Sequence, residues 1–151
     1  NLYVKPKGII LNLWYKILWY GRINVVNYQY DHENIFAKIL RGEIPNQTII
    51  DTDFTLAFKD INPVAPEHVL VIPKGSYINF DHFISKASPE EILDFNKTVN
   101  EVIKKSEASP GSVGQGYRII SNAGEHGFQD VPHLHFHIVS GRFLGPMILK
   151  K

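Results

Sequence analysis

Three histidines occupy alternate positions near the end of the chain: His133, His135 and His137. Alternate residues of a β-strand point to the same face, so a strand here would place the three imidazoles side by side, with the apolar residues between them on the other face. A packed core does not favour three imidazoles, because each ring carries nitrogens that need hydrogen-bonding partners when buried. The run therefore predicts a reactive or ligand-binding site.

Two kinds of chemistry fit this run. In the first, the histidines bind a metal, because His-x-His on a strand is a common geometry for zinc or iron, and His68, Asp60 and Asp130 could supply further ligands. In the second, one imidazole acts as nucleophile or base while its neighbours bind an anion, because imidazole titrates near pH ~6.5. The spacing alone leaves both possibilities open.

The composition limits the possible partners and location. A chain of 151 residues with 44% hydrophobic residues is large enough for one domain with a proper core. A net charge of +1 provides no basic field for a nucleic-acid backbone, which disfavours polymeric nucleic acid but not a small anionic ligand. The absence of cysteine excludes disulfides and thiolate metal sites and gives no support to secretion. We expect a cytoplasmic protein.

The first thirty residues differ from the rest. The apolar, aromatic run at residues 9–20 is too short to span a bilayer, which takes about 20 residues. We interpret residues 1–30 as a poorly specified N-terminal extension and residues 31–151 as the domain. A membrane-surface anchor and a signal peptide remain as alternatives, although the run lacks a small-residue cleavage site and Arg22 and Asn24 follow at once.

The domain shows the patterns of a sheet with two helices. Alternating or β-branched runs predict strands at residues 48–51, 54–59, 68–72, 116–122 and 133–139. A short helix is expected between the cap Asn34 and Gly42, and a long one from the capping box of Ser88 and Glu91 to about Glu107. Residues 76–87 give no clear pattern. The elements predict an α+β fold with an antiparallel sheet of about five strands, one long helix and one short helix.

The run from His133 to Val139 matches the His-φ-His-φ-His-φ-φ signature of the histidine triad (HIT) superfamily, where φ is an apolar residue. Further stretches resemble its Hint branch in the same order, at residues 34–45, 56–73, 116–122 and 129–142. The resemblance covers about residues 33–142. It implies a HIT-like fold, a homodimer, and a nucleotide hydrolase or transferase that needs no metal or cofactor.

The resemblance also implies a role for each matching residue. His135 matches the nucleophile that takes the nucleotidyl group, and His133 and His137 match the flanking members that hydrogen-bond the phosphate and hold the nucleophile. His68 matches a fourth, supporting histidine, and Asp60 matches the carboxylate that accepts from the ribose hydroxyls. The other matches are polar positions beside the phosphate and the apolar slot for the base: Asn122 and Gln129, then Ile35, Phe36, Ile39, Phe58 and Ile61. Plainer roles stay open, as a turn former for Asp60 and as core for Phe36 and Phe58.

The sequence departs from the Hint pattern in several places. Phe128 stands where a glycine is usual, Asp130 where a serine or threonine often contacts phosphate, and Lys59 where a histidine precedes the aspartate. A C-terminal Trp-Pro segment is absent. Because a carboxylate beside an anionic ligand is unfavourable, we hypothesise that Asp130 helps to receive an amine or aminoacyl leaving group.

These features together predict the activity. We expect a nucleotide-binding hydrolase or transferase that cleaves a purine nucleoside monophosphate from a phosphoramidate or related conjugate, through a covalent nucleotidyl-histidine intermediate on His135. The alternatives are a dinucleoside polyphosphate hydrolase, a nucleotide-sensing regulatory protein with little catalysis, and a metal-binding protein.

Overall fold

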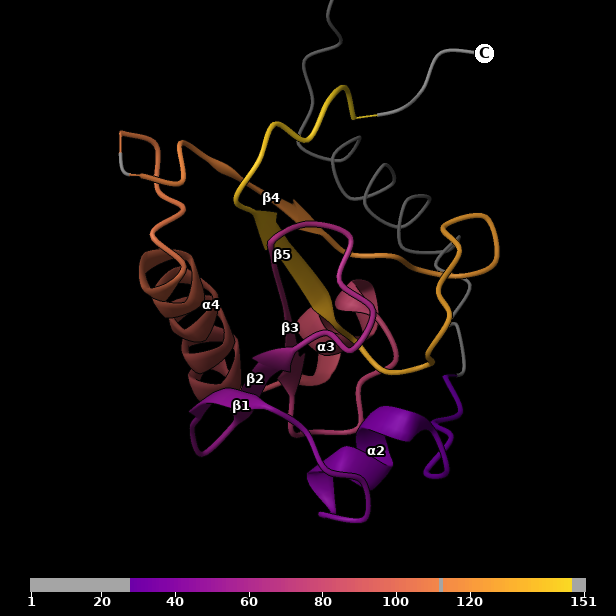
Figure 1. Ribbon diagram of the computed structural model, residues 1–151. Coiled ribbons are helices and arrows are strands. Elements are labelled where there is room, and N and C mark those ends of the chain that lie inside the picture. Colours follow the sequence, from indigo (N-terminus) through magenta and orange to yellow (C-terminus); the bar gives the residue numbers. More distant parts are fainter. Residues whose placement is uncertain (1–27, 112, 148–151) are drawn as a thin grey trace, which may run out of the picture.

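The computed structural model describes residues 28–111 and 113–147 as an antiparallel sheet with helices on both faces (Figure 1). The strands are β1 (Thr48–Asp51), β2 (Thr55–Lys59), β3 (Glu67–Pro73), β4 (Tyr117–Ile120) and β5 (Phe136–Ser140). Their order in the sheet is β1-β2-β3-β5-β4, and every neighbouring pair is antiparallel. The helices are α2 (Ile35–Leu40), α3 (Phe80–Lys86) and α4 (Pro89–Lys105). The expected α+β class and five-stranded sheet are confirmed.

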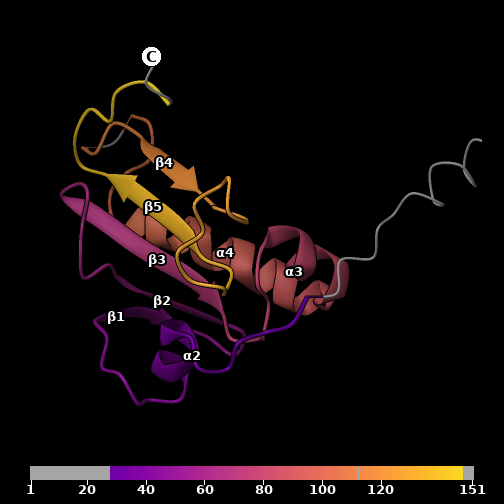
Figure 2. The same ribbon diagram turned by 90° about the vertical axis from the view of Figure 1, so that its right-hand side faces the viewer.

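The two faces of the sheet have separate hydrophobic clusters. On one face, Val69 and Val71 of β3 pack with Phe83 of α3 and Phe95 of α4. On the other face, β2 and β3 pack with α2 through Phe36, Ile39, Leu56, Phe58, Leu70 and Ile72. Figure 2 shows α3 and α4 behind the sheet and α2 in front of it. The strands at the centre of the sheet are therefore buried on both sides.

Local signals account for the helix ends. Ser88 accepts from the backbone N–H of Glu91, and the Glu91 side chain accepts from the backbone N–H of Ser88, so the predicted capping box is present. Asn34 caps α2 by accepting from the N–H groups of Phe36 and Ala37. Helix α3 lies in the segment 76–87 that gave no clear pattern, so the fold has a second short helix.

Strands β2 and β5 begin later than the sequence predicts. Strand β2 begins at Thr55 rather than at residue 54, and its first four residues are buried, so both of its faces are packed. Strand β5 begins at Phe136 and not at His133. The reason is that the N–H of Leu134 donates to the Tyr77 carbonyl and the N–H of His133 to the Val131 carbonyl, outside the sheet. The first two histidines therefore lie on the loop that enters the strand.

Most of the expected N-terminal extension lies outside the described residues, which begin at Tyr28. Tyr28 and Tyr30 contact the domain: the Tyr28 hydroxyl donates to Asp81, and the Tyr30 hydroxyl hydrogen-bonds His133. Residues 28–30 thus pack on the domain, before the expected boundary at residue 31. Within the described residues, no helix is long and apolar enough to cross a membrane.

Candidate active site

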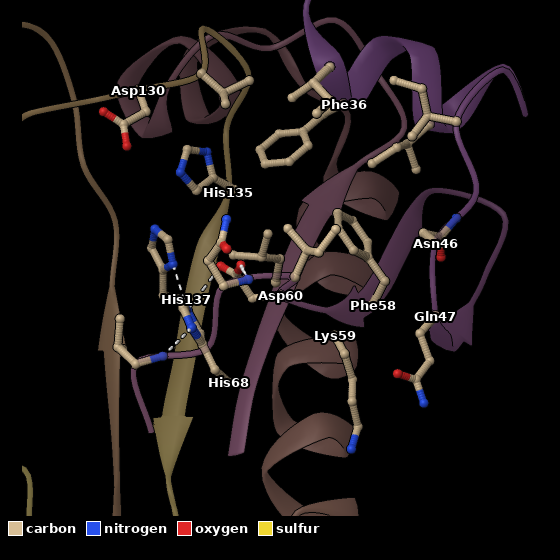
Figure 3. A pocket seen from close by; sticks show the side chains of 18 of the residues that line it. Phe36, Asn46, Gln47, Phe58, Lys59, Asp60, His68, Asp130, His135 and His137 are labelled. Atoms are coloured by element: carbon tan, nitrogen blue, oxygen red, sulfur yellow. Dashed lines mark hydrogen bonds and ion pairs between the residues drawn. The ribbon is translucent and has the colours of Figure 1, made fainter. Parts of the chain in front are cut away.

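A cavity of about 730 Å³ opens on the α2 face of the sheet. It lies between α2, the loop that joins β2 to β3, and the loop that leads into β5 (Figure 3). Most of the residues that the sequence singles out line it: Ile35, Phe36, Ile39, Phe58, Asp60, Ile61, His68, Asn122, Asp130, His135 and His137. His133 and Gln129 do not belong to the lining. The topology therefore brings together residues more than a hundred positions apart.

His135 presents one ring nitrogen with a free lone pair. Its Nδ1 lies 2.7 Å from the backbone oxygen of His133. Because a carbonyl oxygen only accepts, Nδ1 must carry the proton, and Nε2 of the neutral ring keeps its lone pair. Burial lowers the pKa of His135, while the hydrogen bond to His133 and the charges of Asp130 and Asp60 oppose that shift. The ring is thus held neutral, in the tautomer suited to attack through Nε2.

His68 and His137 form a second, directed pair. The backbone N–H of Val64 donates to His68 Nδ1 over 3.3 Å, which places the proton of His68 on Nε2. That nitrogen lies 2.9 Å from Nδ1 of His137 and 3.4 Å from Oδ2 of Asp60. We assign the closer contact as the donated hydrogen bond, which leaves His137 with its proton on Nε2. A donor of this kind suits an anionic phosphate oxygen.

Both rings of this pair are neutral near pH 7. Burial, together with the charges of His135 and His68, lowers the pKa of His137 to about 4. Burial also lowers the pKa of His68, and the nearby charge of Asp60 opposes this. The rings of His135 and His137 meet edge to face, with centroids 4.9 Å apart. Figure 3 shows His135, His137 and His68 in succession along one wall of the cavity.

His133 lies behind this wall and is fully buried. Its Nε2 lies 2.9 Å from the Pro73 carbonyl oxygen, and its Nδ1 takes part in the hydrogen bond with Tyr30. Burial lowers the pKa of His133 to about 4. Since both ring nitrogens meet protein groups, the ring holds the loop in place, and its backbone oxygen orients His135.

Asp60 is a turn former whose carboxylate also lines the cavity. Its Oδ1 accepts from the N–H of Asn62 over 2.8 Å, which is the contact of a turn former. Its carboxylate also lines the cavity beside His68. Each carboxylate oxygen has two lone pairs, so the turn leaves acceptor capacity for a ligand.

The apolar end of the cavity is formed by α2 and β2. Phe36 meets Phe58 and His135 edge to face, with centroids 5.8 and 5.2 Å away. Both phenylalanines belong to the hydrophobic core and also line the cavity, and a contact with a base stays a prediction. Ile61 is 91% exposed at the rim. A flat apolar ligand group would fit between these side chains.

Gln129 supports the loop rather than the cavity. Its Nε2 donates to the carbonyls of Ile78 and Val131 over 2.6 and 2.9 Å, and its Oε1 accepts from the N–H of Gly124.

Other lining residues had no assigned role in the sequence: Ile44, Pro45, Asn46, Gln47, Lys59, Asn62, Val64, Leu70, Phe128 and Val131. Most lie on loops, where spacing carries no face information. Among these residues, only Lys59 and Phe128 are distinctive in the sequence, because they depart from the Hint pattern.

The metal alternative also has a geometric basis. Asp60, His68 and His137 offer ligand atoms that all lie within 4.8 Å of one another. A cation bound there would have to replace the hydrogen bond between His68 and His137. The two imidazoles and the carboxylate could ligate zinc, but Nδ1 of His137 already accepts a hydrogen bond from His68.

Comparisons with known proteins identify the family of this chain. The HIT domain family model matches residues 41–144, so the chain belongs to the HIT family. A 13.2 kDa HIT-like protein of Azospirillum brasilense is 51% identical over 121 residues, which are 80% of this chain and 96% of that protein. The purine nucleoside phosphoramidase of Escherichia coli is 42% identical over 119 residues, 79% of this chain and 96% of that enzyme. The solved structure of a HIT family hydrolase from Clostridium thermocellum aligns with a TM-score of 0.66 at 34% identity, covering 79% of this chain and 99% of that one.

Proposed function

We propose that the protein is a Hint-type hydrolase or transferase that releases a purine nucleoside monophosphate from a phosphoramidate or related conjugate. The observation that carries the proposal is the position of His135, whose Nδ1 donates to the His133 carbonyl and whose ring lines the cavity. A nucleophile needs an available lone pair, and this ring keeps one on Nε2 without a separate base. The name of the E. coli relative supports the same substrate class.

The reaction would proceed in two displacements. His135 Nε2 attacks phosphorus and forms a P–N bond, while the bond from phosphorus to the leaving amine breaks and the amine takes a proton from solvent. The resulting nucleotidyl-imidazolium is positively charged, and the His133 carbonyl and the Asp130 and Asp60 carboxylates lie where they can stabilise it. Water then attacks phosphorus and loses a proton, the bond to Nε2 breaks, and neutral His135 is restored. If an acceptor other than water attacked the same intermediate, the reaction would be a nucleotidyl transfer.

The remaining lining residues would orient the nucleotide. The Nε2–H of His137 and the amide of Asn122 would hydrogen-bond the phosphate oxygens, and Asp60 would accept from the ribose hydroxyls. Phe36 and Phe58 would contact the base. Polar groups at one end of a cavity and apolar groups at the other suit a mononucleotide, whose phosphate and base differ in the same way.

Asp130 lines the cavity at the His135 end, and its charge opposes the burial shift of both His135 and His137. A carboxylate there would repel an anionic leaving group and attract a cationic amine. We therefore assign Asp130 to the leaving-group side, where it would favour amine or aminoacyl conjugates.

The outer edge of β4 suits a second copy of the chain. Strand β4 is last in the strand order, and Tyr117 and Ile119 are each 41% exposed. An edge strand with exposed apolar side chains is a template for pairing with another strand. We propose a homodimer in which the two β4 edges meet.

The test of the activity is mass spectrometry of the intact protein after rapid quenching with an adenosine phosphoramidate. We expect a mass increase of one adenylyl group that peptide mapping places on His135. Absence of an adduct together with no turnover on amine, fluorophosphate and dinucleoside polyphosphate substrates, but with tight AMP binding, would instead indicate a nucleotide-sensing protein.

A further inference from the structure

The hydroxyl of Tyr30 makes a hydrogen bond with Nδ1 of His133. Its ring also meets the His133 ring nearly edge to face, with centroids 5.5 Å apart and planes at 68°. Tyr30 precedes the region that the sequence predicted as the domain, and it does not line the cavity. Tyr30 therefore reaches the cavity only through its neighbours, which are His133 and the α2 cap Asn34, and of these His133 is the one bonded to His135.

The partners of His133 fix the direction of this hydrogen bond. The Pro73 carbonyl oxygen, 2.9 Å from Nε2, only accepts, so Nε2 carries the proton of the neutral ring. Nδ1 therefore has the lone pair, and the Tyr30 hydroxyl donates to it. Burial raises the pKa of Tyr30, which keeps the phenol protonated. In this tautomer both ring nitrogens of His133 have a hydrogen-bonding partner, whereas in the other tautomer Nε2 would face the Pro73 carbonyl without a proton.

A chain of hydrogen bonds continues from His133 to His135. The backbone oxygen of His133 accepts from His135 Nδ1 over 2.7 Å, so the position of this peptide sets the orientation and tautomer of the His135 ring. We propose that Tyr30 is a positioning residue for the nucleophile: it fixes the ring of His133 so that the peptide carbonyl of that residue stays aligned with His135. This inference rests on the proposed function, because it assigns His135 as the group that reacts.

Packing alone does not supply the same constraint. Phe36 meets the ring of His133 at a centroid distance of 6.1 Å and that of His135 at 5.2 Å. It restricts where the two rings lie, but a phenyl ring has no hydrogen-bonding atom and cannot select a tautomer. The Pro73 carbonyl selects the tautomer at Nε2, and the Tyr30 hydroxyl supplies the donor that the lone pair on Nδ1 then needs.

The test compares Tyr30→Phe with Tyr28→Phe. Tyr30→Phe keeps the ring contact and removes only the donor, leaving a buried acceptor unsatisfied. Tyr28 is the matched control, because its hydroxyl hydrogen-bonds Asp81 and Asn79 and its ring stacks on His82, in the same segment but away from His133. For Tyr30→Phe we expect kcat to fall about tenfold, the order of effect of one buried hydrogen bond, with the Kd for AMP within about twofold. Tyr28→Phe should keep the kcat of the native protein.

Nitrogen-15 NMR of the imidazoles provides a readout that does not depend on turnover. In the native protein we expect the proton of His133 on Nε2 and that of His135 on Nδ1, and in Tyr30→Phe a changed Nδ1 resonance of His133, because that lone pair loses its donor. An unchanged kcat in Tyr30→Phe, an equal loss in both variants, or a proton on Nδ1 of native His133 would overturn the inference. If the native protein turns over no substrate, the proposed function fails, and the NMR result alone decides whether Tyr30 fixes the ring.

Discussion

Nε2 of His68 lies 2.9 Å from Nδ1 of His137, and the backbone decides which ring donates. The N–H of Val64 occupies the other nitrogen of His68, so the proton lies between the two rings and His137 is left with a donor on Nε2. Protonation of both rings would place two N–H groups against each other. The geometry is therefore consistent only with a pair that carries at most one proton between its facing nitrogens.

The burial of His135 has a consequence for the pH dependence of turnover. The nucleophile must be neutral, and burial lowers the pKa of His135 below its ordinary value of 6.5. The acidic limb of kcat/KM should therefore have its midpoint below 6.5. A pH–rate profile with circular dichroism at each pH measures it. An acidic limb with its midpoint at or above 6.5 would contradict the assigned environment.

The burial of His133 makes the free energy of unfolding depend on pH. Unfolded His133 titrates at the ordinary value of 6.5, but in the folded protein its pKa is about 4, so the unfolded state binds more protons between these values. The free energy of unfolding should fall as pH decreases from 6.5 toward 4, by roughly 3 kcal/mol from this ring. Urea denaturation over that range measures the slope.

Replacement of His135 by alanine tests the nucleophile. His135→Ala should lose at least about a thousandfold in kcat, because it removes the atom that forms the covalent bond, yet should bind AMP within about tenfold of the native protein. His126→Ala is the matched control, since His126 is exposed and outside the cavity. Retained turnover in His135→Ala would move the nucleophile elsewhere.

Asp60→Asn separates the turn from the ribose contact. The asparagine oxygen can still accept from the N–H of Asn62, so the loop should survive while the charge is lost. We expect the Kd for AMP to rise about tenfold, because hydrogen bonds to a charged acceptor are the stronger ones, and the Kd for a nucleotide lacking both ribose hydroxyls to change much less. Calorimetry measures both.

Asp31→Asn is the matched control for that experiment, because Asp31 accepts from the N–H of Glu33 in a similar turn outside the cavity. Equal weakening of both ligands in Asp60→Asn would show that Asp60 acts on the fold of the site and not on the ribose.

The leaving-group role of Asp130 predicts a change in substrate preference. Asp130→Ser should lower the ratio of kcat/KM for amine-leaving over fluorophosphate-leaving substrates by about tenfold, since it removes a charge that attracts only the former. Glu125→Ser, on the same loop but outside the cavity lining, should keep the native ratio. An unchanged ratio in Asp130→Ser would refute the role.

The proposed pairing of β4 edges can be tested by oligomeric state. Ile119→Lys would place like charges near each other across the edge, and sedimentation should show a shift from dimer to monomer. Ile84→Lys is the control, because Ile84 is 45% exposed, close to the 41% of Ile119, but lies on α3. A native protein that sediments as a monomer, or an Ile119→Lys variant that remains dimeric, would refute this interface.

The sequence predicted best the elements whose signals are local. The capping box of Ser88 and the cap of Asn34 involve neighbours within a few residues, and both helices begin where expected. Helix α3 was missed because only Phe83 on it is buried, while Phe80 and Ile84 are exposed, so it lacks an apolar stripe. The start of β5 was misplaced because it depends on a hydrogen bond between Leu134 and Tyr77, which are far apart in sequence.

The site was predictable as a set of residues but not in its geometry. The family signature led to His68, Asp60, His135 and His137, and these lie together in the cavity. The signature also groups His133 with them, whereas the structure places its ring behind the wall. Spacing along a chain cannot show which nitrogen of a ring meets which partner, because those partners come from other strands and loops.

The partner of His135 is a peptide carbonyl, and this has a consequence for how the protein could evolve. A side-chain partner can be lost through a single codon change, but a main-chain oxygen is present whatever residue stands at that position. The tautomer of the attacking ring is therefore insulated from most mutations in the surrounding cavity. Exposed lining residues such as Asp130 and Phe128 could then vary without changing the tautomer of the proposed nucleophile.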